Sequence, residues 1–407
     1  MASTGRILFV TEKFPHPVDD GGQIRTFHVL AGLAAELPVT LVSLDAPSAA
    51  DAQAIRDLGV EVVACGPRRN RLAAPWFAAE ALFTRAPYPM RKNFSGRMLA
   101  EIRRRLRDGG VRAVHWNHLD AAQYLEHLGP DLGSDRRSVP TVFDTHNLLA
   151  RIYERFAQTA VNPLRKGYAA LQWWRMSRFE PAILRAATRV LVCSDLERQL
   201  VHTWGVDGAM VVPNGVDIAR YAAISRRTRG EGERPAILFT GGLAYPPNAE
   251  GVRWFVEKVV PELRRRLPRF RFVVVGKGAP RALLDLGKPG EIEFTGWVDD
   301  VRPVLQRADV CVVPLHVGGG TRIKILEAMA AGVPVVSTRV GAEGIAARDG
   351  ESIALADFPE DMARAIADLV GSPSTADSMA ARARELVASR HDWSAVTRPL
   401  IDLYREL

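Results

Sequence analysis

Cysteine is scarce in this 407-residue sequence, which contains three. Cys65, Cys193 and Cys311 each lie in or at the end of an apolar, strand-like run, and none has a cysteine or histidine partner close by in the chain. An odd number at this spacing argues against a disulfide framework and against a zinc knuckle. We therefore expect three small, buried hydrophobic side chains.

Long apolar runs are also missing. No stretch approaches the roughly 20 apolar residues that a membrane-spanning helix needs. The first fifteen residues, MASTGRILFVTEKFP, have one arginine followed by a short strand-like run, which is not the layout of a signal peptide. We therefore expect a cytoplasmic protein.

Two common ligand motifs are absent as well. No G-x-G-x-x-G follows the first strand-like run, which argues against a dehydrogenase. No acidic cluster has a spacing that we interpret as a metal site, so we expect none. The chain is nevertheless ordinary in composition, with 47% hydrophobic and 25% charged residues, as in globular proteins.

What the sequence does contain is a regular alternation of apolar runs and helical patterns. The runs of the first half are RILFVTE, PVTLVSL, VEVVACG, AVHWNH, TVFDTH, RVLVCSD and MVVPNGV. Those of the second half are AILFTGG, RFVVVGKG, IEFTGWV, DVCVVPL, PVVST and SIAL. Apolar strands joined by helices indicate an α/β protein whose parallel sheets are covered on both faces. The pattern occurs twice, so we expect two doubly wound, Rossmann-like domains.

A polar segment, ISRRTRGEGERP at 224–235, separates the halves and is typical of a linker. We predict an N-terminal domain at 1–217, a linker at 218–235, a C-terminal domain at 236–385 and a C-terminal helix at 386–407 that can cross back to the N-terminal domain. Residues 148–187 should be one or two helices without an intervening strand. Pro399 should break or kink the last helix.

Ligands of doubly wound sheets bind outside the carboxyl ends of the strands, so the loops there are the candidate sites. Gly21 and Gly22 precede a helix and suit an anion or a sugar hydroxyl. His146 follows the fifth strand. In the second half Gly242 and the pair Gly276–Lys277 follow strands, and their glycines allow close approach of the backbone to a ligand.

The densest candidate site is the segment VPLHVGGGTRIKILEAMAAGVPVVST at 313–338. Its glycines, including Gly319 and Gly320, precede a helix for which Thr321 is the predicted N-cap. The helix dipole, Arg322 and Lys324 supply positive charge that suits a diphosphate. Glu327 would repel phosphate, so we expect it to face a neutral polyol such as ribose.

These motifs resemble the donor-binding signature of retaining glycosyltransferases of family 4, which have the GT-B fold with two sheets facing a central cleft. PNGVD at 213–217 matches another recurrent element of that family, and FTGWVDD, with Trp297 and Val298, resembles its base-binding strand and loop. The resemblance covers nearly the whole chain. It implies transfer of a sugar from a nucleotide diphosphate sugar without a metal or another cofactor, with His146 at the transferred sugar and Arg322, Lys324 and Glu327 at the donor.

The sequence departs from the family at one position. The usual signature has two glutamates with seven residues between them; Glu327 matches the second, and Gly319 stands at the first. The chain instead resembles a branch with a GGGTRxKxLEAMA motif. In many members an Arg and a Lys that neutralise the diphosphate come from the loop and helix after the first strand of the C-terminal domain. Here the region after AILFTGG has no well-matched Lys, so Arg322 and Lys324 are expected to take over part of that role.

Other interpretations remain open. A nucleotide-sugar epimerase of the same fold would release a free epimer. A non-catalytic nucleotide-sugar binder would bind the donor but neither hydrolyse nor transfer it. A two-domain solute-binding protein would need export. The acceptor of a transferase could be a saccharide, a lipid-linked molecule or a small molecule, and we expect no nucleic-acid partner.

The net charge of +8 is concentrated in the segment from Arg91 to Arg112, which has eight cations and two carboxylates, or +6. Met98, Ile102 and Leu106 form one helical stripe there. We expect this stripe to pack into the N-terminal domain. Peripheral contact with an anionic membrane through the exposed arginines, 103, 104, 105 and 107, is one interpretation, and a solvated helix face is the other.

Overall fold

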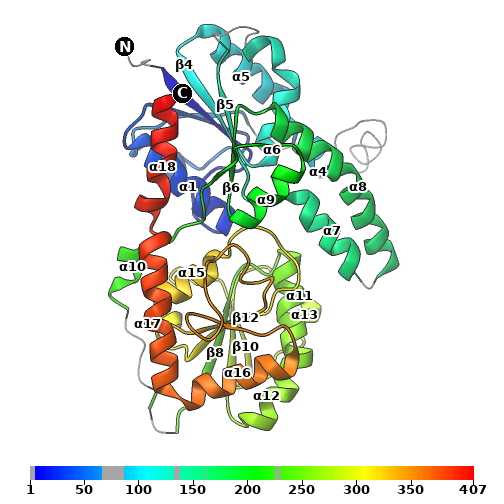
Figure 1. Cartoon of the computed structure of the whole chain (residues 1–407), viewed down its shortest axis with the longest axis vertical. Helices are drawn as coiled ribbons and strands as arrows, with labels where there is room; N and C mark the ends of the chain where they lie inside the picture. The colour runs from blue at the N-terminus through cyan, green and yellow to red at the C-terminus, as the bar shows by residue number, and fades with distance from the viewer. Residues whose placement is uncertain (1–4, 67–86, 133–137, 161, 225–228, 231) are drawn as a thin grey trace. The chain divides into compact units, whose positions relative to one another are not determined.

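The computed structural model describes residues 5–66, 87–132, 138–160, 162–224, 229–230 and 232–407. The chain divides into two compact units. Unit 1 comprises Met1–Pro213 and Ser394–Leu407, and unit 2 comprises Asn214–Trp393. Each unit contains one parallel sheet with helices around it (Figure 1).

The sheet of unit 1 has seven parallel strands in the order β3-β2-β1-β4-β5-β6-β7. They are β1 (Arg6–Thr11), β2 (Val39–Ser43), β3 (Glu61–Ala64), β4 (Val111–Asn117), β5 (Thr141–Asp144), β6 (Arg189–Val192) and β7 (Met210–Val211). The order reverses between β1 and β4, which is the topological switch point of a doubly wound sheet. Loops at the carboxyl ends of β1 and β4 are therefore placed to hold a ligand.

Helices cover this sheet and join its strands. They are α1 (Gly21–Ala34), α2 (Ala49–Arg56), α4 (Tyr88–Asn93), α5 (Gly96–Asp108), α6 (Leu119–Ala122), α7 (Leu149–Thr159), α8 (Pro163–Ala186), α9 (Asp195–Thr203) and α18 (Trp393–Glu406), with 3₁₀ turns at Gln123–His127 and Gly129–Leu132. The two helices expected in 148–187 are α7 and α8, which pack side by side as a hairpin (Figure 1). The predicted stripe of Met98, Ile102 and Leu106 is buried on α5.

Unit 2 has six parallel strands in the order β10-β9-β8-β11-β12-β13. They are β8 (Ala236–Thr240), β9 (Arg271–Val275), β10 (Ile292–Gly296), β11 (Val310–Val313), β12 (Val335–Ser337) and β13 (Ala354–Leu355). Its helices are α10 (Ile218–Ala222), α11 (Pro246–Trp254), a π-helical turn (Phe255–Val259), α12 (Val260–Arg266), α13 (Arg281–Leu284), α14 (Arg302–Gln306), α15 (Ile323–Ala330), α16 (Pro359–Gly371) and α17 (Pro373–Arg390). Each strand predicted from the sequence is present in the two sheets.

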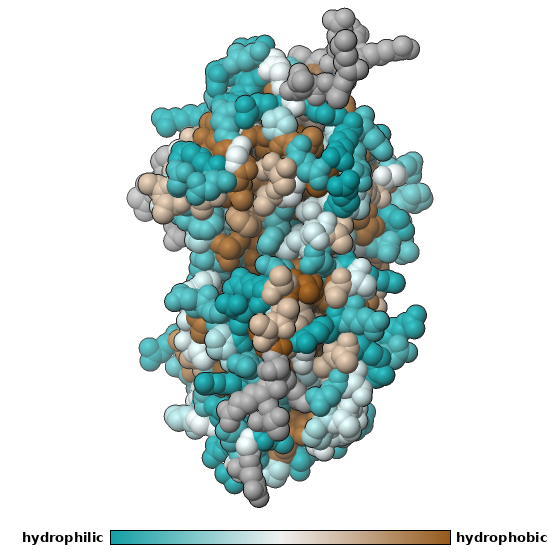
Figure 2. Space-filling model, turned by 90° about the vertical axis from the view of Figure 1, so that its left-hand side faces the viewer, coloured by the Kyte–Doolittle hydropathy of each residue, from teal (hydrophilic) through white to brown (hydrophobic). Residues whose placement is uncertain are grey.

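The central strands are apolar on both faces because helices cover both sides of each sheet. All residues of β2 and β11 are buried, and β1 is buried except for Arg6. Cys193 and Cys311 are buried and Cys65 is partly buried, and none of the three forms a disulfide. Hydrophilic and hydrophobic side chains mix on the side of the molecule drawn in Figure 2, as is usual for a folded surface.

The last helix, which was predicted to break or kink at Pro399, does not break there. α18 runs through Pro399 without interruption, and the chain leaves the helical path earlier, between Arg390 and Trp393. Pro399 is exposed, whereas the opposite side of the helix buries Val396, Leu400 and Tyr404. Burial of these side chains offsets the cost of a proline inside a helix, which is about 3 kcal/mol.

The predicted linker at 218–235 contains α10, which belongs to unit 2. Asp217 caps this helix by accepting a hydrogen bond from the amide of Arg220, at 3.0 Å. Tyr221 is buried in the core of unit 2. Residues 225–228 and 231 of the predicted linker lie outside the described residues.

Candidate functional site

In unit 1 the carboxyl ends of β1, β4 and β5 meet the start of α1. Asn117 links these elements, because its Nδ2 donates to Thr11 Oγ1 at 3.1 Å and to Thr26 Oγ1 at 3.0 Å. These two bonds leave Asn117 Oδ1 as an acceptor, and His146 Nε2 lies 3.0 Å from it. The proton of His146 is therefore on Nε2, and Nδ1 is the acceptor nitrogen.

His146 lies beside the start of α1, because both follow parallel strands and therefore lie at the same edge of the sheet. A Cβ added to Gly22 would lie 3.8 Å from His146 Nδ1. Gly21 and Gly22 open α1, and Asp20 caps it by accepting from the amide of Gln23 at 2.9 Å. Burial lowers the pKa of His146 well below its usual value, so the ring is neutral at pH 7. A neutral imidazole suits hydrogen bonding to a sugar hydroxyl.

Asp144, which ends β5, serves the structure of unit 1. It is fully buried and accepts from Arg25 at 2.6 Å and 3.2 Å, and Arg25 also donates to the carbonyl oxygens of Val212 and Pro213. Burial would raise the pKa of Asp144, but Arg25 lowers it below the ordinary value. This charged pair ties α1 to the end of unit 1 and leaves His146 as the candidate for chemistry at β5.

His118 is a neighbour of this site that the sequence reasoning missed. It follows β4 with φ 73° and ψ 163°, an uncommon backbone conformation for a residue with a side chain. Its ring stands edge-on to that of His146, with centroids 5.4 Å apart, and its Nδ1 is 2.8 Å from Asp120 Oδ2. Burial opposes protonation of His118, but the hydrogen bond to Asp120 raises its pKa overall. A histidine at the carboxyl end of a parallel strand was the available signal.

In unit 2 three glycine loops follow β8, β9 and β11. A Cβ at Gly276 would overlap the carbonyl oxygen of Gly241, and a Cβ at Gly241 would overlap Lys324 Nζ. Both glycines also have positive φ, 154° and 145°. Glycine is therefore required where these two loops meet Lys324. Gly242 is open on the side where a side chain would project.

Lys324 is the centre of this arrangement. Its Nζ donates to Asn248 Oδ1 at 2.9 Å and lies 4.1 Å from the centre of the Phe239 ring. Asn248 is held in turn by its Nδ2, which donates to the carbonyl oxygen of Gly242 at 2.8 Å. Burial, and then the charge of Arg322, lower the pKa of Lys324 to about 7. Asn248, which opens α11 together with two prolines, was not predicted.

The start of α15 differs from the prediction. The N-cap is Arg322, not Thr321, and α15 begins at Ile323. Thr321 is buried, and its carbonyl oxygen accepts from Asn214 Nδ2 at 2.8 Å, so the turn into the helix comes one residue later. The guanidinium of Arg322 folds back onto the carbonyl oxygens of Gly319 and Gly320. It thereby lies over the glycine loop, at the end of α15 where the helix dipole is positive.

Glu327 lies one turn further along α15. The hydroxyl of Tyr221 donates to Glu327 Oε1 at 2.9 Å. Burial raises the pKa of Glu327, while the bond from Tyr221 and the charges of Arg220 and Lys324 lower it, with a raised pKa as the result. The PNGVD motif supports this region, since Asn214 holds the loop before α15 and Asp217 caps the helix that carries Tyr221.

Trp297 and Val298, the residues expected at the base, directly follow β10, and Lys277 follows the neighbouring strand β9. Lys277 Nζ is 4.6 Å from the centre of the Trp297 ring, and Trp297 Nε1 donates to Asp299 at 3.0 Å. Lys277 and Trp297 are exposed, whereas Val298 packs against the core of unit 2. The structure thus brings together two subsets of the predicted unit 2 residues, one around Lys324 and one around Trp297.

Two family models match the chain. Residues 50–220 match the model described as Glycosyltransferase Family 4, and residues 234–372 match the model described as Glycosyl transferases group 1. The chain belongs to the glycosyltransferases. The class of enzyme expected from the sequence is therefore confirmed.

Individual glycosyltransferases are similar to parts or all of this one. The glycogen synthase of Mycobacterium tuberculosis (strain H37Rv) is 27% identical over 300 residues, which are 67% of this chain and 70% of that protein. The phosphatidyl-myo-inositol mannosyltransferase of Mycolicibacterium smegmatis is 31% identical over 222 residues, 53% of this chain and 56% of its own.

A solved structure extends the likeness to the whole fold. The HepE protein of Anabaena, in complex with UDP-glucose, matches 99% of this chain and 100% of its own, with a TM-score of 0.67 and 14% identity. Together with the two parallel sheets, this likeness confirms the GT-B fold predicted from the sequence. At 14% identity it is evidence of the fold and of nothing further.

The length of the helices and the ion pairs of α5 bear on the predicted contact with a membrane. No helix in the described part of the chain is long and apolar enough to cross a bilayer. On α5 the arginines expected to face a membrane are paired with carboxylates. Arg103 and Arg107 pair with Asp131, Arg104 with Glu101 and Asp108, and Arg105 with Glu61 and Glu101.

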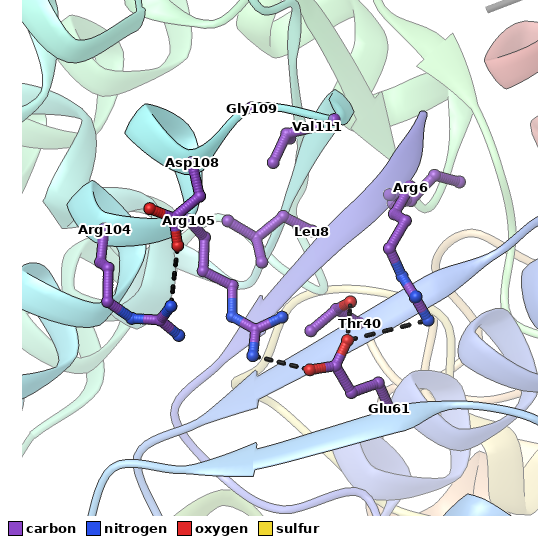
Figure 3. A pocket seen from close by; sticks show the side chains of 11 residues that line it. Arg6, Leu8, Thr40, Glu61, Arg104, Arg105, Asp108, Gly109 and Val111 are labelled. Carbon is purple, nitrogen blue, oxygen red and sulfur yellow. Dashed lines mark hydrogen bonds and ion pairs between the residues drawn. The ribbon is translucent and has the colours of Figure 1, made fainter. Parts of the chain in front are cut away.

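Part of this network lines a pocket at the amino ends of β1 to β4 (Figure 3). The carboxylate of Glu61 accepts hydrogen bonds from Arg105 at 2.7 Å and from the hydroxyl of Thr40 at 2.9 Å. Arg6 Nη2 lies 3.7 Å from Glu61 Oε2. The cations are locally balanced by the carboxylates. The α5 arginines thus offer less net charge to a membrane than the sequence suggested.

Proposed function

We propose that this glycosyltransferase transfers a sugar from a nucleotide diphosphate sugar to an acceptor, with retention of the anomeric configuration. The observation that carries the proposal is the cradle around Lys324. There an ammonium group, the two glycine loops of Gly241 and Gly276, and the positive end of α15 converge at the carboxyl ends of β8, β9 and β11. Such an arrangement suits a diphosphate, which it stabilises as the leaving group.

The donor's other groups follow from this placement. Glu327, whose Oε1 is held by Tyr221, accepts hydrogen bonds from ribose hydroxyls, and the exposed Trp297 with Lys277 and Val298 contacts the base. Gly242, Gly319, Gly320 and Thr321 contribute backbone to the donor site. The chain represents the GGGTRxKxLEAMA branch, in which Gly319 stands in place of the first glutamate. Backbone polar groups of the glycine loop then take over the contacts that the missing carboxylate would make.

In unit 1 we assign His146 to a hydrogen bond at the transferred sugar, and Gly21 and Gly22 to the donor or the acceptor side. The charge that builds up on the leaving diphosphate is stabilised by Lys324, Arg322 and the dipole of α15, so that transfer requires no metal. The leaving phosphate oxygen helps to deprotonate the acceptor hydroxyl. The cytoplasm is the proposed compartment.

The acceptor is proposed by class. The names of the two relatives include glycogen and phosphatidyl-myo-inositol, so a saccharide and a lipid-linked molecule are both candidates, beside a small molecule. Peripheral contact with an anionic membrane remains a prediction, although the ion pairs of α5 do not favour that helix as the surface.

Product analysis tests this function. The protein is incubated with a panel of nucleotide sugars, first alone and then with saccharide and lipid acceptors, and products are identified by mass spectrometry and by the anomeric proton coupling in NMR. We expect slow hydrolysis of one donor and transfer from it, both abolished in Lys324→Met. Release of a free epimer would identify an epimerase instead, and tight binding without turnover would identify a nucleotide-sugar binder.

A further inference from the structure

The helix α8 has large apolar side chains both on the side that packs and on the side that does not. Its inner side buries Ala169, Met176, Phe179 and Ile183 in unit 1. The outer side of α8 is nevertheless exposed along most of the helix, and every residue from 162 to 168 is exposed.

Several large apolar side chains of α8 are exposed, most of them on this outer side. Eleven large hydrophobic side chains are exposed in the described part of the chain, and five of them belong to α8. They are Leu164 (84% exposed), Tyr168 (48%), Leu171 (42%), Trp173 (38%) and Trp174 (54%). Scattered exposed hydrophobic residues are normal, but a group on one element marks an interaction surface.

The charge of the same helix has one sign. α8 contains five cations, at 165, 166, 175, 178 and 185, and one carboxylate, Glu180. Glu180 is fully buried and accepts hydrogen bonds from the amides of Leu149 and Ala150, at 2.9 and 2.8 Å, at the start of α7. Among the described side chains of α8, the exposed charges are therefore all positive. Unlike the arginines of α5, they have no acidic residue on their own helix surface.

We propose that this surface, the α8 face, docks the protein on an anionic lipid bilayer. We define it as Leu164, Tyr168, Leu171, Trp174 and Arg178, which lie along one side of the helix, with Lys166 and Trp173 at its edge. Tryptophan and tyrosine lie at the boundary between lipid headgroups and acyl chains, and Lys and Arg beside them bind anionic headgroups. Arg178 lies over the Trp174 ring at 4.4 Å, which joins the two kinds of group in one contact.

The charge also decides between lipid and a second copy of this chain. Two α8 faces brought together would place clusters of like charge against each other, whereas an anionic bilayer complements them. The hairpin of α7 and α8 extends at the edge of unit 1 (Figure 1), so its outer side can lie on a flat surface. The proposal concerns attachment and holds whether or not the chain is an active transferase.

Vesicle co-sedimentation of the full-length protein tests the proposal. Vesicles of phosphatidylcholine are compared with vesicles that also contain phosphatidylglycerol, at low and high salt. We expect binding that requires phosphatidylglycerol and falls with salt. Lys166→Gln combined with Arg178→Gln should weaken it about 25-fold, because each cation near an anionic surface contributes a factor of about five. Trp174→Ala should weaken it about tenfold through lost apolar burial.

Matched controls separate the α8 face from other surfaces. Arg104→Gln combined with Arg107→Gln removes two exposed cations of α5, and Phe358→Ala removes an exposed aromatic ring of unit 2 that is 70% exposed. Both controls should bind vesicles as the parent does. All variants change exposed side chains, and circular dichroism with thermal unfolding verifies that they fold.

Three results would overturn the proposal. The first is equal recovery in the supernatant with neutral and anionic vesicles at low salt. The second is a loss of binding in the α5 variant with none in the α8 variants, which would move the surface to α5. The third is a dimer in sedimentation velocity that Trp174→Ala dissociates while vesicle binding is absent, which would make a second copy the occupant.

Discussion

At the scale of single residues, Lys324 is a side chain whose charge at neutral pH depends on its surroundings. Its ammonium is surrounded by the ring of Phe239, the amide of Asn248 and the neighbouring guanidinium of Arg322, and its pKa falls to about 7. A phosphate beside it would favour the charged form and raise this pKa. Binding of a diphosphate at the proposed site would therefore be coupled to uptake of a proton.

Lys324→Met should weaken binding of the nucleoside diphosphate by one to two decades. Loss of a charge-assisted contact costs about 1.5–3 kcal/mol, and about 1.4 kcal/mol is a factor of ten. Arg322→Ala should act in the same direction. Titration calorimetry measures both, with Lys258→Ala, an exposed lysine of unit 2, as the control. Unchanged affinity in both variants would remove the phosphate site from this loop.

The affinity for the nucleotide sugar should fall as pH rises above 7. Lys324 is protonated below its pKa of about 7 and neutral above it, and only the ammonium attracts the diphosphate. Each pH unit above 7 should cost up to about tenfold, since one pKa unit is worth about 1.36 kcal/mol, until the raised pKa of the complex is exceeded. Titrations from pH 6 to pH 9 check this, and Lys324→Met should give a flat profile. A flat profile in the parent would contradict it.

Glu327→Ala should weaken binding of a nucleoside diphosphate more than binding of free pyrophosphate. The reason is that its proposed partner is the ribose and not the phosphates. A loss of about 1–3 kcal/mol for the nucleoside diphosphate alone is expected. Tyr221→Phe is the companion variant, because it removes the hydroxyl that orients Glu327 without removing the carboxylate. Normal binding of nucleotide by Glu327→Ala would show that the ribose assignment is wrong.

At the scale of elements, the site of unit 2 depends on how closely three loops approach. Neighbouring strands β9, β8 and β11 bring Gly276, Gly241 and the loop before α15 to one edge of the sheet. The loop before α15 is held from outside by Asn214, and its last residues are held by Arg322. A small change in one of these loops should therefore shift the other groups around Lys324.

Gly276→Ala should destabilise the protein and abolish donor binding. Its φ of 154° is unfavourable for alanine, and the added Cβ would overlap the carbonyl oxygen of Gly241. We expect a loss of about 2 kcal/mol or more in the free energy of unfolding. Gly167→Ala in α8 is the matched control, because its Cβ would meet open space and alanine favours helix by up to about 1 kcal/mol. Denaturant titration compares the two, and equal stabilities would refute the argument.

At the scale of the whole molecule, the proposed chemistry needs no metal. Lys324, Arg322 and the dipole of α15 supply the positive charge that a metal ion would otherwise provide. Transfer should therefore continue in excess chelator at an unchanged rate. Assays of donor consumption with and without chelator measure this. Complete loss of activity that magnesium or manganese restores would contradict the proposal.

The strands and the fold class could be predicted because each strand has its own apolar signature. All apolar runs named from the sequence form strands. The glycines predicted to follow strands in the second half lie in the loops after β8, β9 and β11. Contacts between residues far apart in sequence could not be predicted. Asn248 on Lys324, Tyr221 on Glu327 and His118 beside His146 are such contacts.

The sequence by itself determined which elements form, because local hydrophobic period and glycine placement act over a few residues. It also determined the chemical types at the proposed donor site, a cation pair, glycines and one carboxylate. Only the tertiary structure decided what those groups touch. Burial against Phe239 and Arg322 lowers the pKa of Lys324, acidic residues from α5 and other elements balance the α5 arginines, and the outer side of α8 stays uncovered. Each of these depends on neighbours that packing, and not sequence distance, brings together.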